Sequence, residues 1–322
     1  MLAGRARASA NQHDHKETSM NIAIIGLGKM GGNMARRLAR GGAKVYGFDL
    51  SAETRSKLAA EEPNFQGFDS VAKLVASLPK PRVVWLMLPA GEISENTFAE
   101  LKTLLAPGDL VVDGANAMYK DSQRHAAELA EGGFRFVDAG VSGGVWGLAN
   151  GYTIMLGGEK EAVAQVEPFV KLLAPAPDRG WIHCGPAGSG HYTKMVHNGI
   201  EYGMMQAFAE GFALLKAKED FNLDLGEISE VWRHGSVIRS WLLDLIAGTL
   251  AEDTDLAGLA AYVPDSGEGR WTVLESIELG VPAPVITQAL FSRFSSRGND
   301  DFAMKLLSMM RNAFGGHAVA KQ

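Results

Sequence analysis

Residues 21–49 read Asn21-Ile-Ala-Ile-Ile25, then Gly26-Leu-Gly28-Lys-Met-Gly31, and later Lys44-Val-Tyr-Gly-Phe48 followed by Asp49. The first segment has the apolar character of a short strand, and the glycine pattern follows it at once. Residues 33–40 have the composition of a helix, and an acidic residue stands 23 positions after Gly26. A bare GxGxxG pattern is weak evidence, but strand, glycine turn, helix and distant acid together predict a dinucleotide-binding unit.

The three glycines have separate physical tasks. Gly26 permits the tight turn, and Gly28 lets a pyrophosphate approach the N–H groups at the helix N-terminus. Gly31 allows the helix to pack closely on the strand. The intervening Leu27, Lys29 and Met30 supply the rest of this loop.

Asp49 predicts which dinucleotide is bound. A carboxylate at the end of the second strand accepts hydrogen bonds from both ribose hydroxyls of the adenosine, and it repels a 2′-phosphate. We therefore expect NAD, with NADP disfavoured. Arg55, one turn into the next helix, would relieve part of that repulsion.

Further apolar runs follow at the spacing of a doubly wound parallel sheet, with strands predicted at 83–88, 110–113, 134–137 and 153–156. Their C-terminal ends carry loops that should line the cofactor crevice. These loops contribute Leu88 and Pro89, then Asn116, and then Ser142, Gly143 and Gly144.

The chain divides into three predicted parts. Residues 1–20 are polar and are expected to be a disordered extension. Residues 21–187 form the Rossmann-type domain, which ends after a last strand at 180–184. Residues 188–322 are rich in helical patterns and form an all-helical domain for substrate binding and oligomerisation.

Composition excludes several classes of partner. The formal net charge of −6 argues against nucleic acid and anionic membranes, and no apolar run reaches the roughly 18 residues that span a bilayer. The lone Cys184 excludes a disulfide framework and a thiolate metal site, and it is typical of a reducing cytoplasm. We expect a cytoplasmic enzyme.

The segment from Gly188 to Tyr202 carries the chemistry. Read as a helix, it places an amine, an imidazole, an amide, a carboxylate and a phenol on one stripe, namely Lys194, His197, Asn198, Glu201 and Tyr202. Val196 and Ile200 on the back, and apolar residues further along, predict a helix buried nearly all round. The polar stripe should then face a cavity and serve acid–base chemistry.

The run Lys194-Met-Val-His-Asn-Gly-Ile-Glu-Tyr202 closely resembles the signature helix of the 6-phosphogluconate dehydrogenase family. In that family the lysine is the general base and the glutamate the general acid. Asn116 and the Ser142-Gly143-Gly144 turn match positions that contact substrate, although Ala117 replaces the serine usual after the asparagine.

The resemblance also implies a phosphate site. Arg270 stands where the family has a lysine in Gly-x-Gly-Lys-Trp-Thr, and Arg293 matches the arginine of Ala-x-Phe-x-Arg. Arg311 and His317 reproduce a C-terminal pair that reaches into the neighbouring subunit. A homo-oligomer, dimer or tetramer, is therefore implied, and the chain is similar to the short form that lacks a duplicated helical region.

The resemblance implies an oxidoreductase of the pentose phosphate pathway and gluconate utilisation. It would oxidise and decarboxylate 6-phospho-D-gluconate, a phosphorylated sugar acid, to ribulose 5-phosphate with NAD. No metal is expected, because protonated Lys194 replaces a Lewis acid, and Lys194 would need burial and a neighbouring cation to be neutral near pH 7. The alternative is a β-hydroxyacid dehydrogenase of the 3-hydroxyisobutyrate dehydrogenase type, which would need no phosphate site and no Glu201.

Overall fold

The computed structural model describes residues 20–315, 318 and 320. It forms two compact units. The first comprises residues 20–115 and Ser122–Ser189, and the second comprises Asn116–Asp121 and the residues from Gly190 onward. The sequence predicted residues 1–20 to be disordered, and all but Met20 of them lie outside the described residues.

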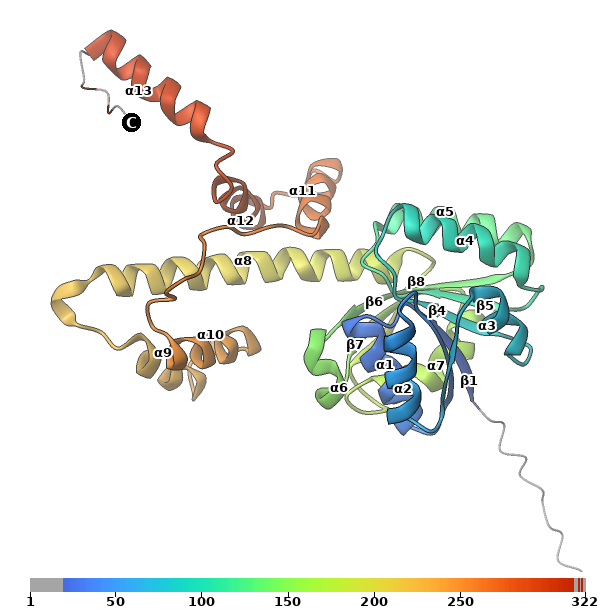
Figure 1. Cartoon of the computed structure of the whole chain (residues 1–322). Helices are drawn as coiled ribbons and strands as arrows, with labels where there is room; N and C mark the ends of the chain where they lie inside the picture. Colours follow the sequence, from blue (N-terminus) through green and yellow to red (C-terminus); the bar gives the residue numbers. More distant parts are fainter. Residues whose placement is uncertain (1–19, 316–317, 319, 321–322) are drawn as a thin grey trace, which may run out of the picture. The chain divides into compact units, whose positions relative to one another are not determined.

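The first unit is built on one sheet of eight strands in the order β3-β2-β1-β4-β5-β6-β7-β8 (Figure 1). The strands are β1 (Asn21–Ile25), β2 (Lys44–Phe48), β3 (Phe65–Phe68), β4 (Val83–Leu86), β5 (Leu110–Asp113), β6 (Arg135–Ser142), β7 (Thr153–Gly158) and β8 (Trp181–Gly185). The helices with them are α1 (Lys29–Arg40), α2 (Ala52–Glu61), α3 (Val71–Ser77), α4 (Glu92–Leu104), α5 (Tyr119–Glu131), η1 (Gly144–Trp146), α6 (Gly147–Asn150) and α7 (Lys160–Leu173).

Every pair of neighbouring strands is parallel except β6 and β7, which are antiparallel. The prediction of a doubly wound parallel sheet is confirmed for the rest of the sheet, and this one antiparallel pair was not predicted. The link from β6 to β7 holds only the short η1 and α6, whereas a parallel crossover needs a dozen or more residues and usually a full helix. The predicted strands also did not include β3, a four-residue strand at the edge of the sheet.

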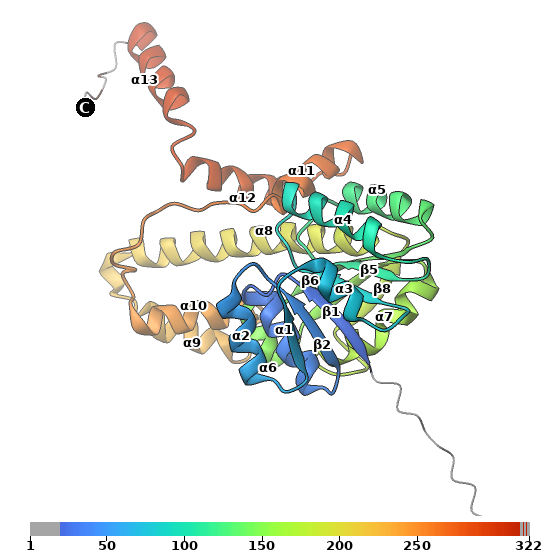
Figure 2. The same cartoon turned by 45° about the vertical axis from the view of Figure 1, so that its right-hand side comes forward.

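Alternate residues of β1 enter two different cores. Ile22 and Ile24 pack with α1 and α7, whereas Ala23 and Ile25 pack with α3 and α4. All four side chains are at most 1% exposed. Figures 1 and 2 show α4 and α5 on one side of the sheet and α1 and α7 on the other. A parallel strand covered on both faces is therefore apolar throughout, as the sequence indicated.

The second unit is helical. It contains α8 (Ser189–Ala217), η2 (Glu219–Phe221), α9 (Leu225–Arg233), α10 (Trp241–Glu252), α11 (Glu268–Glu278), α12 (Pro284–Ser295) and α13 (Asp301–Gly315). A small core joins Tyr202 of α8 to Ala289 and Leu290 of α12. α9 and α10 lie beside the C-terminal half of α8 (Figure 2).

The prediction that α8 is buried nearly all round is wrong. Its buried residues end at Gly203, while Ile200 is 53% exposed and Leu214 is 75% exposed. α9 and α10 cover the side that carries Phe208 and Phe212, and Leu214 lies on another side. The apolar periodicity of this half is therefore not explained by packing within the described part of one chain.

Candidate active site

The glycine loop after β1 has the geometry that its sequence predicted. Gly26 has φ +93°, and a methyl group built on it would lie 2.5 Å from the carbonyl oxygen of Met87. A methyl group on Gly31 would lie 2.0 Å from the carbonyl oxygen of Gly26. Both distances are far inside van der Waals contact, so a larger residue at Gly26 would push the turn away from the segment after β4, and one at Gly31 would push α1 away from the turn.

Gly28 presents an open anion cradle. It is the N-cap of α1, it supplies no side-chain cap, and the first turn of α1 has no acidic residue. A methyl group built on Gly28 would meet no heavy atom of the described chain within 4 Å. The N–H groups at a helix N-terminus need partners and favour negative charge. The residues present therefore fit a dinucleotide pyrophosphate.

The other residues of the loop divide between solvent and core. Lys29 is exposed, whereas Leu27 is 3% exposed and Met30 packs partly against the sheet core. Of these three, Lys29 is the most exposed, Met30 is half-buried and Leu27 is buried. The backbone N–H of Leu27 donates a hydrogen bond to the carboxylate of Asp49.

Asp49, directly after β2, is held against the glycine loop. Its Oδ2 accepts the N–H of Leu27 at 2.8 Å, and its Oδ1 accepts the N–H of Ser51 at 2.9 Å. The guanidinium of Arg55 donates to the backbone carbonyls of Asp49 and Leu50. The carboxylate is thus fixed in direction, and a cation lies at the same turn.

The later loops start at the carboxyl ends of their strands, as predicted. Leu88 and Pro89 follow β4, and Ser94 Oγ donates to the carbonyl of Pro89 at 2.8 Å. Asn116 follows β5; it is exposed and belongs to the second unit. Ser142 is the last residue of β6, so that strand is longer than the predicted 134–137.

The turn after Ser142 depends on its two glycines. Gly143 has φ +139° and Gly144 has φ +53°, both on the positive side that disfavours other residues. The ring of Tyr152 lies behind the turn, 3.1 Å from a methyl group built on Gly143. The backbone around Ser142 is therefore set by a buried aromatic ring.

Lys194 has the environment of an activated amine. Its side chain is buried, with 8% exposure, and Nζ donates to Oδ1 of Asn198 at 2.6 Å. The same oxygen lies 3.0 Å from Nδ1 of His197. Burial lowers the pKa of Lys194, because desolvation disfavours the ammonium form.

The predicted stripe separates into two groups. Lys194, Asn198 and Tyr202 are buried, whereas the side chains of His197 and Glu201 are 43% and 39% exposed. His197 Nδ1 and Glu201 Oε2 are 3.9 Å apart. Because α8 is not buried all round, the stripe is only partly enclosed within its own unit.

Among the described residues, no cation contributes to the lowered pKa of Lys194, so the neighbouring cation expected from the sequence is not found there. The charged neighbours are the carboxylates of Glu201 and Glu268, which act against the effect of burial. Desolvation of the amine alone supplies the shift.

Arg270 has an internal counter-ion. Its Nε and a terminal nitrogen contact the two oxygens of Asp265 at 2.7 and 3.0 Å, a bidentate pair. Arg297 donates to Oδ2 of the same carboxylate at 2.9 Å. These two arginines hold the pKa of Asp265, whose side chain is 4% exposed, below its usual value.

Two further predicted cations lie in different places. The guanidinium of Arg293 stacks 3.5 Å from the ring centre of Tyr202 and donates to the carbonyl of Pro264. Arg311 is exposed on α13. His317 lies outside the described residues, so the predicted cluster is represented here by Arg270 and Arg293.

Three charged residues of this unit, Asp265, Glu268 and Arg297, were not predicted from the sequence. Two signals for them existed. Arg297 follows Arg293 by four residues, the spacing of one helix face, and Asp265 precedes Arg270 by five. The burial of Glu268 had no such signal, because a glutamate between two glycines is usually a solvated loop residue.

Some features are absent from residues 20–315, 318 and 320. No group of three or more His, Cys, Asp or Glu side chains in that part could hold a metal ion. Within the same part, no helix has the length and apolar character needed to cross a membrane. Cys184 is a free thiol.

A Rossmann-type unit with an open helix N-terminus, followed by a helical unit with a buried lysine, defines a dinucleotide-dependent dehydrogenase. Residues 21–184 match the family model of the NAD-binding domain of 6-phosphogluconate dehydrogenase. Residues 190–305 match the model of its C-terminal domain. The chain belongs to the 6-phosphogluconate dehydrogenase family.

Individual relatives agree. The NAD(+)-dependent, decarboxylating 6-phosphogluconate dehydrogenase of Haloferax volcanii is 41% identical over 304 residues, which cover 94% of this chain and 99% of that protein. The structure of Plasmodium falciparum 6-phosphogluconate dehydrogenase has 29% identity and a TM-score of 0.80, covering 94% of this chain and 66% of that one. Mycobacterium tuberculosis 3-hydroxyisobutyrate dehydrogenase has 25% identity and a TM-score of 0.69, covering 88% and 94%.

Proposed function

We propose that this chain oxidises and decarboxylates 6-phospho-D-gluconate to D-ribulose 5-phosphate and CO2, with NAD as oxidant. The observation that carries the proposal is the buried amine of Lys194, bound by Asn198 at 2.6 Å in the family's C-terminal domain. The similarity to the NAD(+)-dependent, decarboxylating 6-phosphogluconate dehydrogenase of Haloferax volcanii, over 99% of that protein, supports it.

NAD, when bound, supplies the acceptor for the hydride that leaves C3 of the substrate. The N–H groups at Gly28 would hold its pyrophosphate, with Gly26 shaping the turn and Gly31 letting α1 pack closely, and the carboxylate of Asp49 would accept hydrogen bonds from the ribose hydroxyls. The negative charge of Asp49 would repel the 2′-phosphate of NADP, so NAD is favoured. Lys29, Leu88, Pro89 and Asn116 are proposed to complete this site, with the backbones of Leu27 and Met30.

Lys194 is proposed to act twice. Its neutral amine removes the proton of the C3 hydroxyl, and burial favours that neutral form. The oxidised substrate is a β-keto acid. The ammonium of Lys194 then returns the proton to the ketone oxygen while the bond to the departing CO2 breaks and an enediol forms.

Glu201 is proposed as the acid that protonates C1 of the enediol. It lies seven residues beyond Lys194, about 10.5 Å along the helix axis, so the two groups would address different atoms. His197 and Asn198 would orient hydroxyls, and Asn116, Ser142, Gly143 and Gly144 would bind the carboxylate end.

The phosphate is proposed to bind Arg270 and Arg293, with Tyr202 beside them and Arg311 and His317 from a neighbouring subunit. Arginine suits this task because its planar fork binds phosphate oxygens in pairs. Arg297 extends the same cationic group.

The test follows NADH and CO2 in one reaction mixture with 6-phosphogluconate. Equal amounts of both products support the proposal, and NADH without CO2 contradicts it. The second candidate, a 3-hydroxyisobutyrate-type dehydrogenase, is favoured by the similarity that covers 94% of the Mycobacterium tuberculosis chain. Faster turnover of 3-hydroxyisobutyrate than of 6-phosphogluconate would establish that candidate instead.

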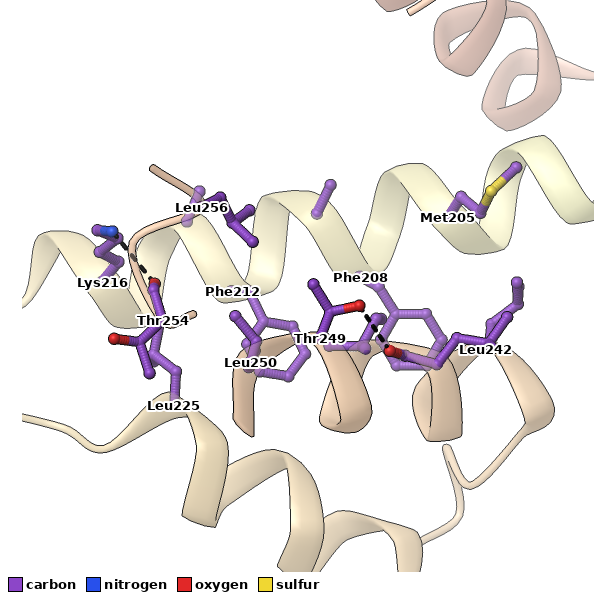
Figure 3. A pocket seen from close by; sticks show the side chains of 14 residues that line it. Met205, Phe208, Phe212, Lys216, Leu225, Leu242, Thr249, Leu250, Thr254 and Leu256 are labelled. Carbon is purple, nitrogen blue, oxygen red and sulfur yellow. Dashed lines mark hydrogen bonds between the residues drawn. The ribbon is translucent and has the colours of Figure 1, made fainter. Parts of the chain in front are cut away.

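We also infer that the chain works as a homo-oligomer in the cytoplasm, in gluconate utilisation or the pentose phosphate pathway. An apolar cavity of about 540 Å³ lies between α8, α9 and α10, lined by Phe208, Phe212 and Leu242 among others (Figure 3). On α13, Phe302 is 78% exposed and Met309 is 55% exposed. Apolar surface of this extent is typical of an interface, and a second copy is the proposed occupant.

The oligomer is tested by light scattering during size-exclusion chromatography. The wild-type chain should elute with the mass of a dimer or tetramer, and Phe212→Glu should shift it toward the monomer. Leu259→Glu, a change at a 73% exposed leucine that does not line the cavity, is the control. A monomeric wild type at micromolar concentration contradicts the proposal.

A further inference from the structure

Glu268, the first residue of α11, is a buried carboxylate that the proposed reaction does not use. The residue is only 2% exposed. Oε2 accepts the hydroxyl of Ser266 at 2.5 Å, and Oε1 has no hydrogen-bond partner among the described residues. Burying a carboxylate oxygen without a partner is costly, so such a group requires an explanation.

The contact between α11 and α8 fixes where this carboxylate lies. Thr272, one turn after Glu268, donates to the carbonyl of Met195 at 2.9 Å and contacts the carbonyl of Glu268 at 2.8 Å. A methyl group on Gly199 would lie 2.7 Å from Thr272, and one on Gly269 would lie 2.4 Å from the ring of Tyr202. The first turn of α11 is thus packed tightly along the turns of α8 that carry Lys194 and Asn198.

Among the described residues, two carboxylates act on the charge of Lys194, first Glu201 of α8 and then Glu268 of α11, and both favour its ammonium form. Glu201 has a side chain that is 39% exposed, so water and salt weaken its effect on the amine. Glu268 is enclosed, and its charge reaches Lys194 through a medium that screens poorly.

We propose that Glu268 is a positioning residue whose enclosed carboxylate, fixed beside α8 by the packing of α11, favours the ammonium form of Lys194 against the effect of burial. Burial alone favours the neutral amine, which takes the hydroxyl proton. The fixed charge of Glu268 stabilises the ammonium, which returns that proton to the ketone oxygen. The proton moves from the hydroxyl to Nζ and back to oxygen.

This inference rests on the proposed role of Lys194, but it can be tested without turnover. The rate at which acetic anhydride acetylates Lys194, followed by mass spectrometry of its peptide, reports the neutral amine at each pH. In Glu268→Gln the midpoint should move to lower pH by about one unit, because an opposing charge has been removed. Glu268→Asp keeps the charge and should stay close to wild type.

Ser266→Ala is the matched control for the local hydrogen bond, and it should leave the midpoint near that of wild type. An unchanged or higher midpoint in Glu268→Gln overturns the inference. The acidic limb of kcat/KM for 6-phosphogluconate should shift in the same direction. If the midpoint of Lys194 acetylation shifts but neither the wild type nor any variant turns over 6-phosphogluconate, the proposed function fails. The effect of Glu268 on Lys194 then still stands.

If Glu268→Gln does not fold, Glu201→Gln serves in its place. The remaining carboxylate near Lys194 is then the enclosed Glu268, so the midpoint should be nearly constant between about 0.05 and 0.5 M salt. A midpoint as sensitive to salt as that of wild type would show that Glu268 does not act on the amine.

Discussion

The amine of Lys194 donates to Oδ1 of Asn198 at 2.6 Å, one helical turn further along α8. Because that oxygen also lies 3.0 Å from His197, the amide holds the amine and the imidazole at one point. This geometry directs the amine without supplying a charge, so its proton affinity depends on burial and on the carboxylates nearby.

Lys194→Met should abolish both NADH formation and CO2 release, since one group carries the proton in both steps. Glu201→Gln should keep part of the NADH formation and part of the CO2 release, because neither step needs a proton from Glu201. Protonation of the enediol should become slow instead. The measurements are single-turnover NADH formation and solvent deuterium incorporation at C1 of ribulose 5-phosphate. Wild-type incorporation in Glu201→Gln would place the acid elsewhere.

The activity should depend on the protonation of Lys194. Burial lowers the pKa of this amine, so its neutral form persists to lower pH than in an ordinary lysine. We expect kcat/KM to fall as the pH drops through that lowered pKa, since the ammonium cannot accept the hydroxyl proton. A profile that keeps its acidic limb when Lys194 is replaced would assign the limb to another group.

Asp49 should control the choice of cofactor. Its carboxylate is fixed by the N–H groups of Leu27 and Ser51, so it cannot turn away from a 2′-phosphate. The wild-type enzyme should prefer NAD over NADP at least about tenfold in kcat/KM, equivalent to about 1.4 kcal/mol. Asp49→Asn combined with Leu50→Arg should move the preference toward NADP, and equal use of both cofactors by the wild type would contradict this account.

Local sequence patterns were sufficient to predict the features that depend only on residues close together in the chain. The strand before Gly26, the turn that needs a positive φ there, and the carboxylate at Asp49 are all short-range features, and the structure has them. The direction of β7 was not accessible in this way, because it depends on the length of the link after Ser142 rather than on the strand itself.

The helical unit shows the opposite case. The spacing of Lys194, Asn198 and Glu201 placed them on one stripe of α8, but it could not reveal that Glu201 is partly exposed while Asn198 is buried. That difference depends on α11, which approaches from more than sixty residues away. Periodicity defines a face, and only tertiary packing decides what covers it.

Arg37 should be important for stability and not for catalysis. Its guanidinium donates to the carbonyls of Leu148, Leu172, Leu173 and Ala174, which ties α1 to the segments around α6 and α7. Arg37→Met should lower the free energy of unfolding by about 3 kcal/mol, because partly buried acceptors lose their donor. Urea denaturation measures this, with Arg36→Met as control, since its pair with Glu61 is worth at most about 1 kcal/mol.

Tyr152 should tolerate loss of its hydroxyl. The residue is fully buried, the hydroxyl has no partner among the described residues, and burial raises the pKa of Tyr152 to about 12. Tyr152→Phe should therefore be neutral or stabilise by about 1 kcal/mol. Gly147→Ala should destabilise, because its methyl group would lie 2.0 Å from the ring. A large loss of stability in Tyr152→Phe would reveal a buried water at the hydroxyl.

Asp265 should orient the cations proposed to bind phosphate. Its carboxylate accepts two hydrogen bonds from Arg270 and one from Arg297. The side chain of Arg270 is 49% exposed and would otherwise be mobile. Asp265→Asn should raise KM for 6-phosphogluconate about tenfold with little change in kcat, because ordering a long side chain at binding costs free energy and the phosphate is remote from C3. Asp255→Asn is the matched control, since it removes a carboxylate that pairs with Lys216 at an exposed position of the same unit. An unchanged or lower KM in Asp265→Asn would mean that the carboxylate competes with the phosphate for these arginines, and a drop confined to kcat would place Asp265 in the chemistry of C3.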